Sequence, residues 1–172
     1  MYLYALDQEE PDSDGHIPEP IPYVAHLMGK IWDKRYVVFC PDMKTSRRLY
    51  DFHPIGTCCV NLDGTLPVNR ENLHSFNTCN HDHLLLAGKF STDVRLLDVE
   101  AMVFMHVLPS DLGMIRYLSR IIKSECPKMY FFAYRYDAIA FYAMNEVVNT
   151  VPHEKIIPFH FTRDILKQQE NE

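Results

Sequence analysis

One stretch of sequence, from Leu96 to Lys123, limits the folds open to this chain more than any other. Residues 97–108 are dense in apolar side chains and stand between the polar Arg95 and Pro109, which indicates a strand buried on both faces. Pro109 ends the strand, and apolar residues then recur at helical spacing. A buried strand followed directly by an amphipathic helix predicts a sheet with helices on its faces.

The turn between this strand and this helix is a candidate anion site. Ser110 and Asp111 offer N-cap side chains, and Gly113 lies where the helix begins. The unpaired N–H groups and the positive helix end at such a turn favour a phosphate or pyrophosphate. Many α/β units of this kind bind nothing, so the turn alone leaves both interpretations open.

Apolar runs and helical spacings predict further elements on both sides of this unit. The expected strands cover residues 2–6, 35–40, 55–62, 84–90, 128–134 and 156–162, and the expected helices cover residues 24–32, 114–123 and 137–147. Residues 44–50 are either a turn of helix or a hairpin connection, and residues 65–83 lose their periodicity and suggest an insertion. The order predicts a single domain, 1–172, of the α+β class (a three-layer α/β arrangement), with a mixed, mostly antiparallel sheet flanked by helices.

Composition narrows the classes of function. The net charge is −6, and the Lys and Arg residues are scattered apart from the adjacent pairs Lys34-Arg35 and Arg47-Arg48, so we expect no nucleic-acid partner. No apolar run approaches the roughly 20 residues of a membrane span, and no basic segment precedes the first apolar residues, so we expect neither a membrane partner nor a signal peptide. Five irregularly spaced cysteines indicate reduced thiols, and the expected location is the cytoplasm.

Two stretches together resemble the GNAT superfamily of N-acetyltransferases. Val107-Leu108-Pro109, with a helix that opens at Gly113, resembles the acyl-CoA pyrophosphate loop. Asp137-Ala138-Ile139-Ala140-Phe141-Tyr142 resembles the second signature helix of the family, after an intervening strand. The chain is therefore identified as a divergent member of this superfamily, with the resemblance running from Leu96 to about Val147.

The resemblance implies an acyl-CoA-dependent N-acetyltransferase that uses acetyl-CoA, in which an unidentified small-molecule or protein amine attacks the thioester directly. Tyr142 stands at the position that protonates the leaving thiolate. Glu100 is the first candidate for the base and His106 the second, because both are ionisable residues expected on one face of the buried strand. The cofactor loop would comprise Val107, Leu108, Ser110, Leu112, Gly113, Met114, Ile115 and Arg116, with Arg135 nearby.

Several positions depart from the family pattern. Ser110 stands where the loop has Arg or Gln, and the branched Ile115 stands where it has Gly or Ala. Arg116 or Arg135 could replace the lost phosphate contacts. The alternative is a catalytically inactive GNAT-like binding or structural module, for example a phage or viral protein, that acts through a protein partner or as a homo-oligomer.

Residues 79–83 bring Cys79, His81 and His83 within one short segment. His-x-His on a strand would direct both rings to one side, as zinc requires. No second pair of similar spacing exists in the chain, so we interpret the histidines as incidental and expect no metal. The sequence also contains no phosphate loop, no Gly-x-Gly-x-x-Gly and no Gly-x-Ser-x-Gly elbow.

Overall fold

A single parallel sheet runs through the part of the chain that the computed structural model describes, which is residues 1–6, 20–63, 67–88, 94–121, 128–134, 137–151 and 157–161. Its seven strands lie in the order β3-β4-β2-β5-β6-β1-β7, and every neighbouring pair is parallel. The strands are β1 (Tyr2–Leu6), β2 (Tyr36–Cys40), β3 (Thr57–Asn61), β4 (His83–Ala87), β5 (Ala101–Phe104), β6 (Lys128–Tyr134) and β7 (Ile157–Phe161).

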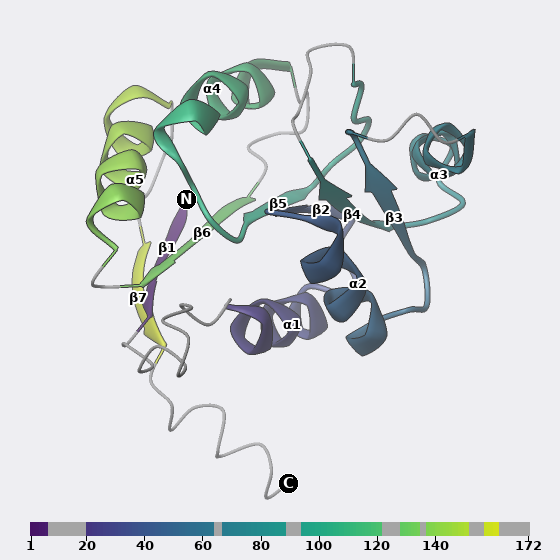
Figure 1. The fold of residues 1–172 in the computed structure, drawn as a ribbon, viewed down its shortest axis with the longest axis horizontal. Helices are drawn as coiled ribbons and strands as arrows, with labels where there is room; N and C mark the ends of the chain where they lie inside the picture. Colours follow the sequence, from purple (N-terminus) through teal and green to yellow (C-terminus); the bar gives the residue numbers. More distant parts are fainter. Residues whose placement is uncertain are drawn as a thin grey trace, which may run out of the picture.

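Helices cover both faces of this sheet (Figure 1). On one face lie α1 (Ile21–Lys30) and α2 (Met43–Phe52), and on the other lie α3 (Pro67–Asn77), α4 (Leu112–Ile121) and α5 (Ala138–Thr150). The helices on the first face connect strands in one direction across the sheet, and those on the second face connect strands in the opposite direction. This division follows from the right-handed crossover that parallel strands adopt.

The three-layer α/β arrangement is confirmed, but the mostly antiparallel sheet predicted from the sequence is wrong. The connection at residues 44–50 belongs to helix α2, and the supposed insertion at 65–83 contains helix α3. A helix between two strands returns the chain to the starting edge, so the strands run parallel. Neither helix carries a broad apolar stripe: α2 buries Thr45, Ser46 and Leu49, and α3 buries Phe76 among the residues described.

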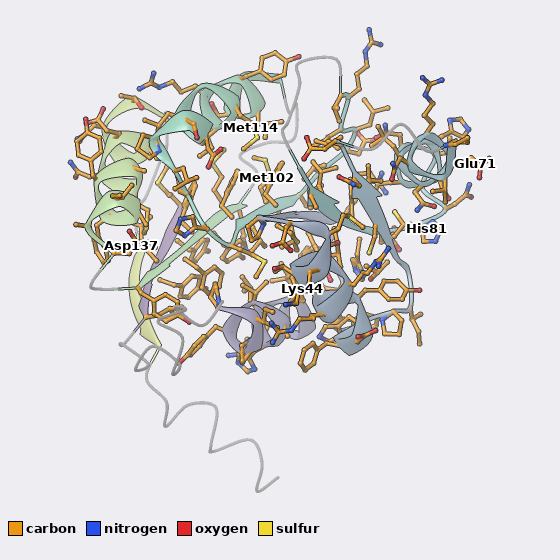
Figure 2. The ribbon with its side chains drawn as sticks, in the orientation of Figure 1. Lys44, Glu71, His81, Met102, Met114 and Asp137 are labelled. Carbon is orange, nitrogen blue, oxygen red and sulfur yellow. The ribbon has the colours of Figure 1, made fainter. Side chains whose placement is uncertain are left out.

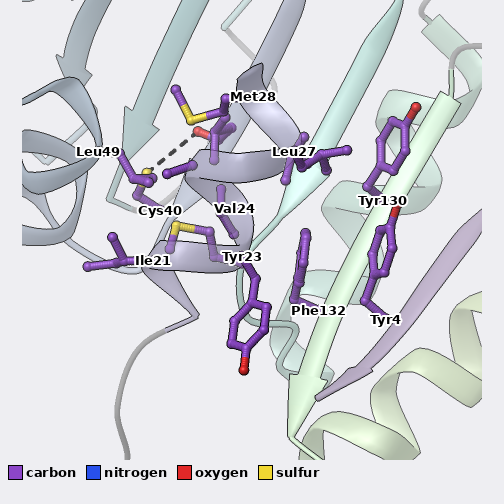
Figure 3. Packing of buried hydrophobic residues seen from close by; sticks show 14 of the residues in the cluster. Tyr4, Ile21, Tyr23, Val24, Leu27, Met28, Cys40, Leu49, Tyr130 and Phe132 are labelled. Atoms are coloured by element: carbon purple, nitrogen blue, oxygen red, sulfur yellow. Dashed lines mark hydrogen bonds between the residues drawn. The ribbon is translucent and has the colours of Figure 1, made fainter. Parts of the chain in front are cut away.

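Successive residues along the strands face two separate cores. On the side of α1, the side chains of Val24, Leu27 and Met28 pack with Tyr4 and Phe132 (Figure 3). The rings of Tyr4 and Phe132 are stacked with their centroids 4.7 Å apart. The other core lies under α3, α4 and α5, and both sets of apolar residues come from strands buried on two faces.

The remaining predicted elements are largely confirmed. Asp137 is the N-cap of α5, where its side chain accepts a hydrogen bond from the N–H of Ala140 at 2.9 Å. β7, which contains Pro158, lies at one edge of the sheet as the proline requires. The buried central strand is shorter than predicted, since β5 covers residues 101–104. Among the residues that are described, no helix is both long enough and apolar enough to cross a membrane.

Candidate binding site at the carboxyl edge of the sheet

The strand order contains a switch point between β2 and β5. These strands are neighbours, but the chain leaves β2 through α2 on one face and leaves β5 through α4 on the other. In open parallel sheets, ligands bind outside the carboxyl ends of the strands at such a point, because the two departing connections leave a crevice between them.

A cavity of about 580 Å³ occupies this position. Its described lining comes from the ends of β2, β4 and β5 and from the first turns of α4. The lining residues are Phe39, Cys40, Pro41, Leu86, Gly88, Phe104, His106, Leu108, Ser110, Asp111, Gly113, Met114 and Tyr117. The volume falls within the range of ligand pockets in proteins.

Two stacked aromatic rings, Phe39 and Phe104, line the floor of this cavity. Phe39 and Phe104 are register partners on β2 and β5, with their ring centroids 4.6 Å apart. Phe104 stacks in turn on Phe131 of β6 at 4.8 Å. Phe104 and Phe131 are buried, whereas Phe39 is partly exposed at the end of the row. The floor therefore presents an apolar surface on which a flat or aliphatic group can pack.

The polar groups at the rim make one local hydrogen bond and one close histidine–aspartate contact. The carboxylate of Asp111 accepts a hydrogen bond from the N–H of Leu108 at 2.8 Å, which closes the turn that leads into α4. His106 lies across from Asp137, with Nδ1 and Oδ2 separated by 3.8 Å. These contacts fix the loop after β5 and connect the rim to the start of α5.

Aspartates follow four of the strands at this edge: Asp42 after β2, Asp63 after β3, Asp111 after β5 and Asp137 after β6. The backbone N–H of Thr45 donates to Asp42 and lowers the pKa of that carboxyl group, so Asp42 stays ionised at neutral pH. Among the described residues that line the cavity there is no lysine or arginine. The cavity is thus apolar at its floor and acidic at its rim.

The predicted cofactor loop divides between the cavity and its surroundings. Leu108, Ser110, Gly113 and Met114 line the cavity. Val107 and Ile115 are fully buried, and Leu112 packs against the same core. Arg116 donates from Nε to Oγ1 of Thr150 on α5 at 3.1 Å, and Arg135 lies outside the described residues.

The three residues predicted to be catalytic are not brought together. Glu100 lies before β5 and accepts a hydrogen bond from the backbone N–H of Arg35 at 2.9 Å. His106 lies beyond the opposite end of that strand, at the cavity rim. Tyr142 is 59% exposed on α5. Glu100 and His106 therefore do not share a strand face, because the strand is only four residues long.

The histidines of residues 79–83 have separate structural partners. Nδ1 of His81 lies 2.8 Å from Oγ of Ser75, and Nε2 of His83 donates to the carbonyl oxygen of Trp32 at 2.8 Å. In the described ranges, no three His, Cys, Asp or Glu side chains gather as metal ligands would.

A basic surface on α2 was not predicted from the sequence, although Arg47-Arg48 was recognised as an adjacent basic pair. Lys44, Arg47 and Arg48 are exposed, while Thr45, Ser46 and Leu49 of the same helix are buried. The cations lie at i, i+3 and i+4, so they share one side of the helix. The signal was present in the sequence, but it becomes visible only when residues 43–52 are recognised as a helix.

Comparison with known proteins identifies the fold. No family model matches the sequence, and no curated protein matches it. Several solved structures do match. The E. coli DEAD-box protein SrmB, bound to RraA, matches with a TM-score of 0.66 and 11% identity, covering 96% of this chain and 91% of that one. Domain 2 of the DEAD-box helicase Mss116p, bound to an RNA duplex, matches with a TM-score of 0.66 and 12% identity, covering 98% of this chain and 67% of that one.

Dbp5 of S. cerevisiae, bound to Gle1 and IP6, matches with a TM-score of 0.65 and 11% identity over 99% of this chain. This chain spans 45% of that Dbp5 chain, somewhat less than half its length. Dbp5 is also matched in a complex with RNA and ADP BeF3. The fold is accordingly that of the RecA-like domains of DEAD-box proteins.

These findings correct four predictions. The GNAT resemblance is wrong, because the matching structures are helicase domains and the sheet is parallel throughout. The N-acetyltransferase function and the acetyl-CoA cofactor are contradicted with it, since the matching structures named above are of helicases, two of them bound to RNA and one of these also to ADP BeF3. The expectation of no nucleic-acid partner is also contradicted, because two of these matching structures are bound to RNA.

Proposed function

We propose that this chain is a helicase-type RecA-like domain that binds RNA and acts as the second of two such domains in an ATP-dependent RNA helicase. The observation that carries the proposal is the likeness in fold to Mss116p domain 2, solved on an RNA duplex, which extends over 98% of this chain. The 172 residues contain no Gly-x-x-x-x-Gly-Lys-Ser/Thr phosphate loop. The domain would therefore contribute RNA contacts while a companion domain holds the nucleotide.

The basic surface of α2, formed by Lys44, Arg47 and Arg48, is the described surface best suited to RNA phosphates. Its three exposed cations lie within five residues, and α2 begins beside the carboxyl end of β2. The overall charge of −6 does not prevent binding, because charges more than about 8 Å away are largely screened at physiological salt. Contacts to phosphates would give binding with little sequence preference.

Fluorescence anisotropy with a labelled ten-nucleotide single-stranded RNA tests this proposal. The unmodified chain should bind with a dissociation constant on the order of 10⁻⁴ to 10⁻⁶ M. The variant K44A/R47A/R48A should lose about tenfold in affinity. The slope of its log binding constant against log salt concentration should become shallower by roughly 2.

The matched control is R70A/R95A/K128A, which removes the same charge from exposed positions on other elements. Its affinity should fall much less, because only a local contact distinguishes the two triple variants. Equal losses in both would show that α2 makes no specific contribution, and no binding by the unmodified chain would contradict the RNA-binding role itself.

A further inference from the structure

We propose that the cavity at the carboxyl ends of β2, β4 and β5 is a docking site for a segment of a protein partner that carries a large apolar side chain beside an arginine or a lysine. This proposal goes beyond RNA binding by α2 and does not depend on it. The cavity lies at the carboxyl edge of the sheet and is lined by Met114 of α4, whereas Lys44 lies on α2 on the other side of the sheet (Figure 2).

The apolar part of the partner follows from the shape and the floor of the cavity. A volume of about 580 Å³ has room for a large side chain, and the partly exposed ring of Phe39 continues the stacked row of Phe104 and Phe131. Leu86 and Met114 close the sides. An aromatic or long aliphatic group placed here would remove apolar surface from water and could stack on Phe39.

The basic part of the partner follows from the charge of the rim. Asp111 is the one carboxylate among the described lining residues, and no described lysine or arginine of the lining offsets it. One of its oxygens is engaged by the N–H of Leu108, so the carboxylate is held in a fixed orientation toward the rim. Asp42 and Asp137 flank the same edge.

The same charges disfavour a phosphate ligand. The start of α4 would ordinarily attract an anion, but Asp111 occupies that position and carries a negative charge of its own. His106 could supply positive charge when protonated, yet it lies 3.8 Å from the carboxylate of Asp137, which offsets it. The rim is therefore complementary to a cation and not to an RNA backbone.

Small probes of matched size test the chemistry directly. The methyl group of Met114 reports on the cavity in a methionine-methyl NMR titration, with its signal assigned by Met114→Leu and with the buried Met28 on the far face as an internal reference. The three probes are benzamidine, benzamide and benzoate, which share a phenyl ring and differ in charge. Benzamidine should shift the Met114 signal saturably, benzamide should bind several-fold more weakly, and benzoate should leave the signal unchanged.

Two variants localise the effect. Asp111→Asn keeps an oxygen that accepts from Leu108 but removes the charge, so benzamidine should then bind no better than benzamide. Gly113→Leu should abolish binding of all three probes by filling the cavity. That variant is expected to fold, because a β-carbon at Gly113 meets no protein atom within 4 Å and leucine favours a helix more than glycine does.

A pair of peptides then tests the partner class, acetyl-Arg-Phe-Arg-amide against acetyl-Glu-Phe-Glu-amide. The basic peptide should shift Met114 and the acidic peptide should not. Binding of benzoate or of the acidic peptide at equal strength would overturn the charge assignment. A Met114 shift caused by the ten-nucleotide RNA would reassign the cavity to RNA, and the absence of a shift with every probe would show that the cavity is not a docking site.

Discussion

Gly88 and Asp63 lie at the carboxyl ends of the neighbouring strands β4 and β3, so close together that a β-carbon on Gly88 would stand 2.6 Å from Oδ2 of Asp63. The backbone nitrogen of Asp63 would lie 2.9 Å from the same β-carbon, and Gly88 has a φ of +93°. Only glycine meets both conditions without strain.

Gly88→Ala is therefore expected to lower the free energy of unfolding by about 2 kcal/mol. Urea denaturation measures the change. Gly113→Ala is the matched control, because that residue is helical and its surroundings are open, and it should raise the stability by up to about 1 kcal/mol. Equal midpoints for the two variants would mean that the close approach of the strand ends is not as described.

Stability should fall as the pH drops below about 6.5, the ordinary pKa of histidine. Burial lowers the pKa of His83, whose ring stacks on Tyr36 with centroids 4.2 Å apart and donates to Trp32. The folded protein therefore keeps His83 neutral while the unfolded chain takes up a proton, so acid favours unfolding. Burial lowers the pKa of His26 in the same direction.

Urea midpoints at pH 5, 6, 7 and 8 give the dependence of stability on pH. The variant His83→Gln retains a hydrogen-bond donor but does not titrate, so it should reduce this dependence. The stabilising effect is complete above the unfolded pKa and is lost as the pH falls toward the lower folded value. A His83→Gln variant with an unchanged pH slope would remove His83 as the source of the effect.

Arg35 joins three segments at the amino ends of the strands. Its guanidinium donates to the carbonyl oxygens of Leu97, His81 and Phe76, and lies 3.9 Å from the centroid of the Phe76 ring. Arg35→Lys keeps the charge but cannot reach all three carbonyls, so a loss of about 3 kcal/mol is expected.

Thermal or urea unfolding measures this loss, with the exposed Arg70→Lys as the control that should change stability by less than about 0.5 kcal/mol. If Arg35→Lys were as stable as the unmodified chain, the three hydrogen bonds of the guanidinium group would not contribute to the stability of the fold.

Two asparagines of α3 protect the edge strand β3. Asn72 donates from Nδ2 to the carbonyl oxygen of Cys59 at 2.8 Å, and Oδ1 of Asn69 accepts from the N–H of Asn61 at 3.0 Å. N69A/N72A should lower the stability by about 2 kcal/mol and should increase self-association through the exposed edge.

Light scattering at increasing protein concentration detects this association. The control N145A/N149A removes two exposed asparagines from α5 and should leave both stability and association nearly unchanged. Association of the control variant to the same extent would point to a cause other than the edge of β3.

The sequence predicts the parts of this fold whose residues repeat a clear apolar pattern. The strands and the helices α1, α4 and α5 follow from such patterns. α2 and α3 could not be found in that way, because a polar helix that buries Thr45, Ser46 and Leu49 shows little apolar periodicity. Without these two helices the strands on either side were predicted to be antiparallel, whereas they are parallel.

Part of the predicted cofactor loop lies at the cavity, but the acidic rim was not predicted. The turn after β5 was predicted to hold an anion, and four of the residues predicted there, Leu108, Ser110, Gly113 and Met114, line a cavity. The cavity's charge depends on which strands end beside one another, and that order cannot be read from the chain alone. Of the predicted catalytic residues, Glu100 lies before the amino end of β5, His106 lies at the cavity rim beyond its carboxyl end, and Tyr142 lies on α5.

Amide NMR mapping of the chain during titration with a ten-nucleotide single-stranded RNA tests the central proposal most directly. The account predicts saturable shifts in the first turns of α2, around Lys44, Arg47 and Arg48, with little change around Glu71 on α3. A titration that moves no α2 resonance, or that moves α3 instead, would contradict the proposed role of this domain in binding RNA.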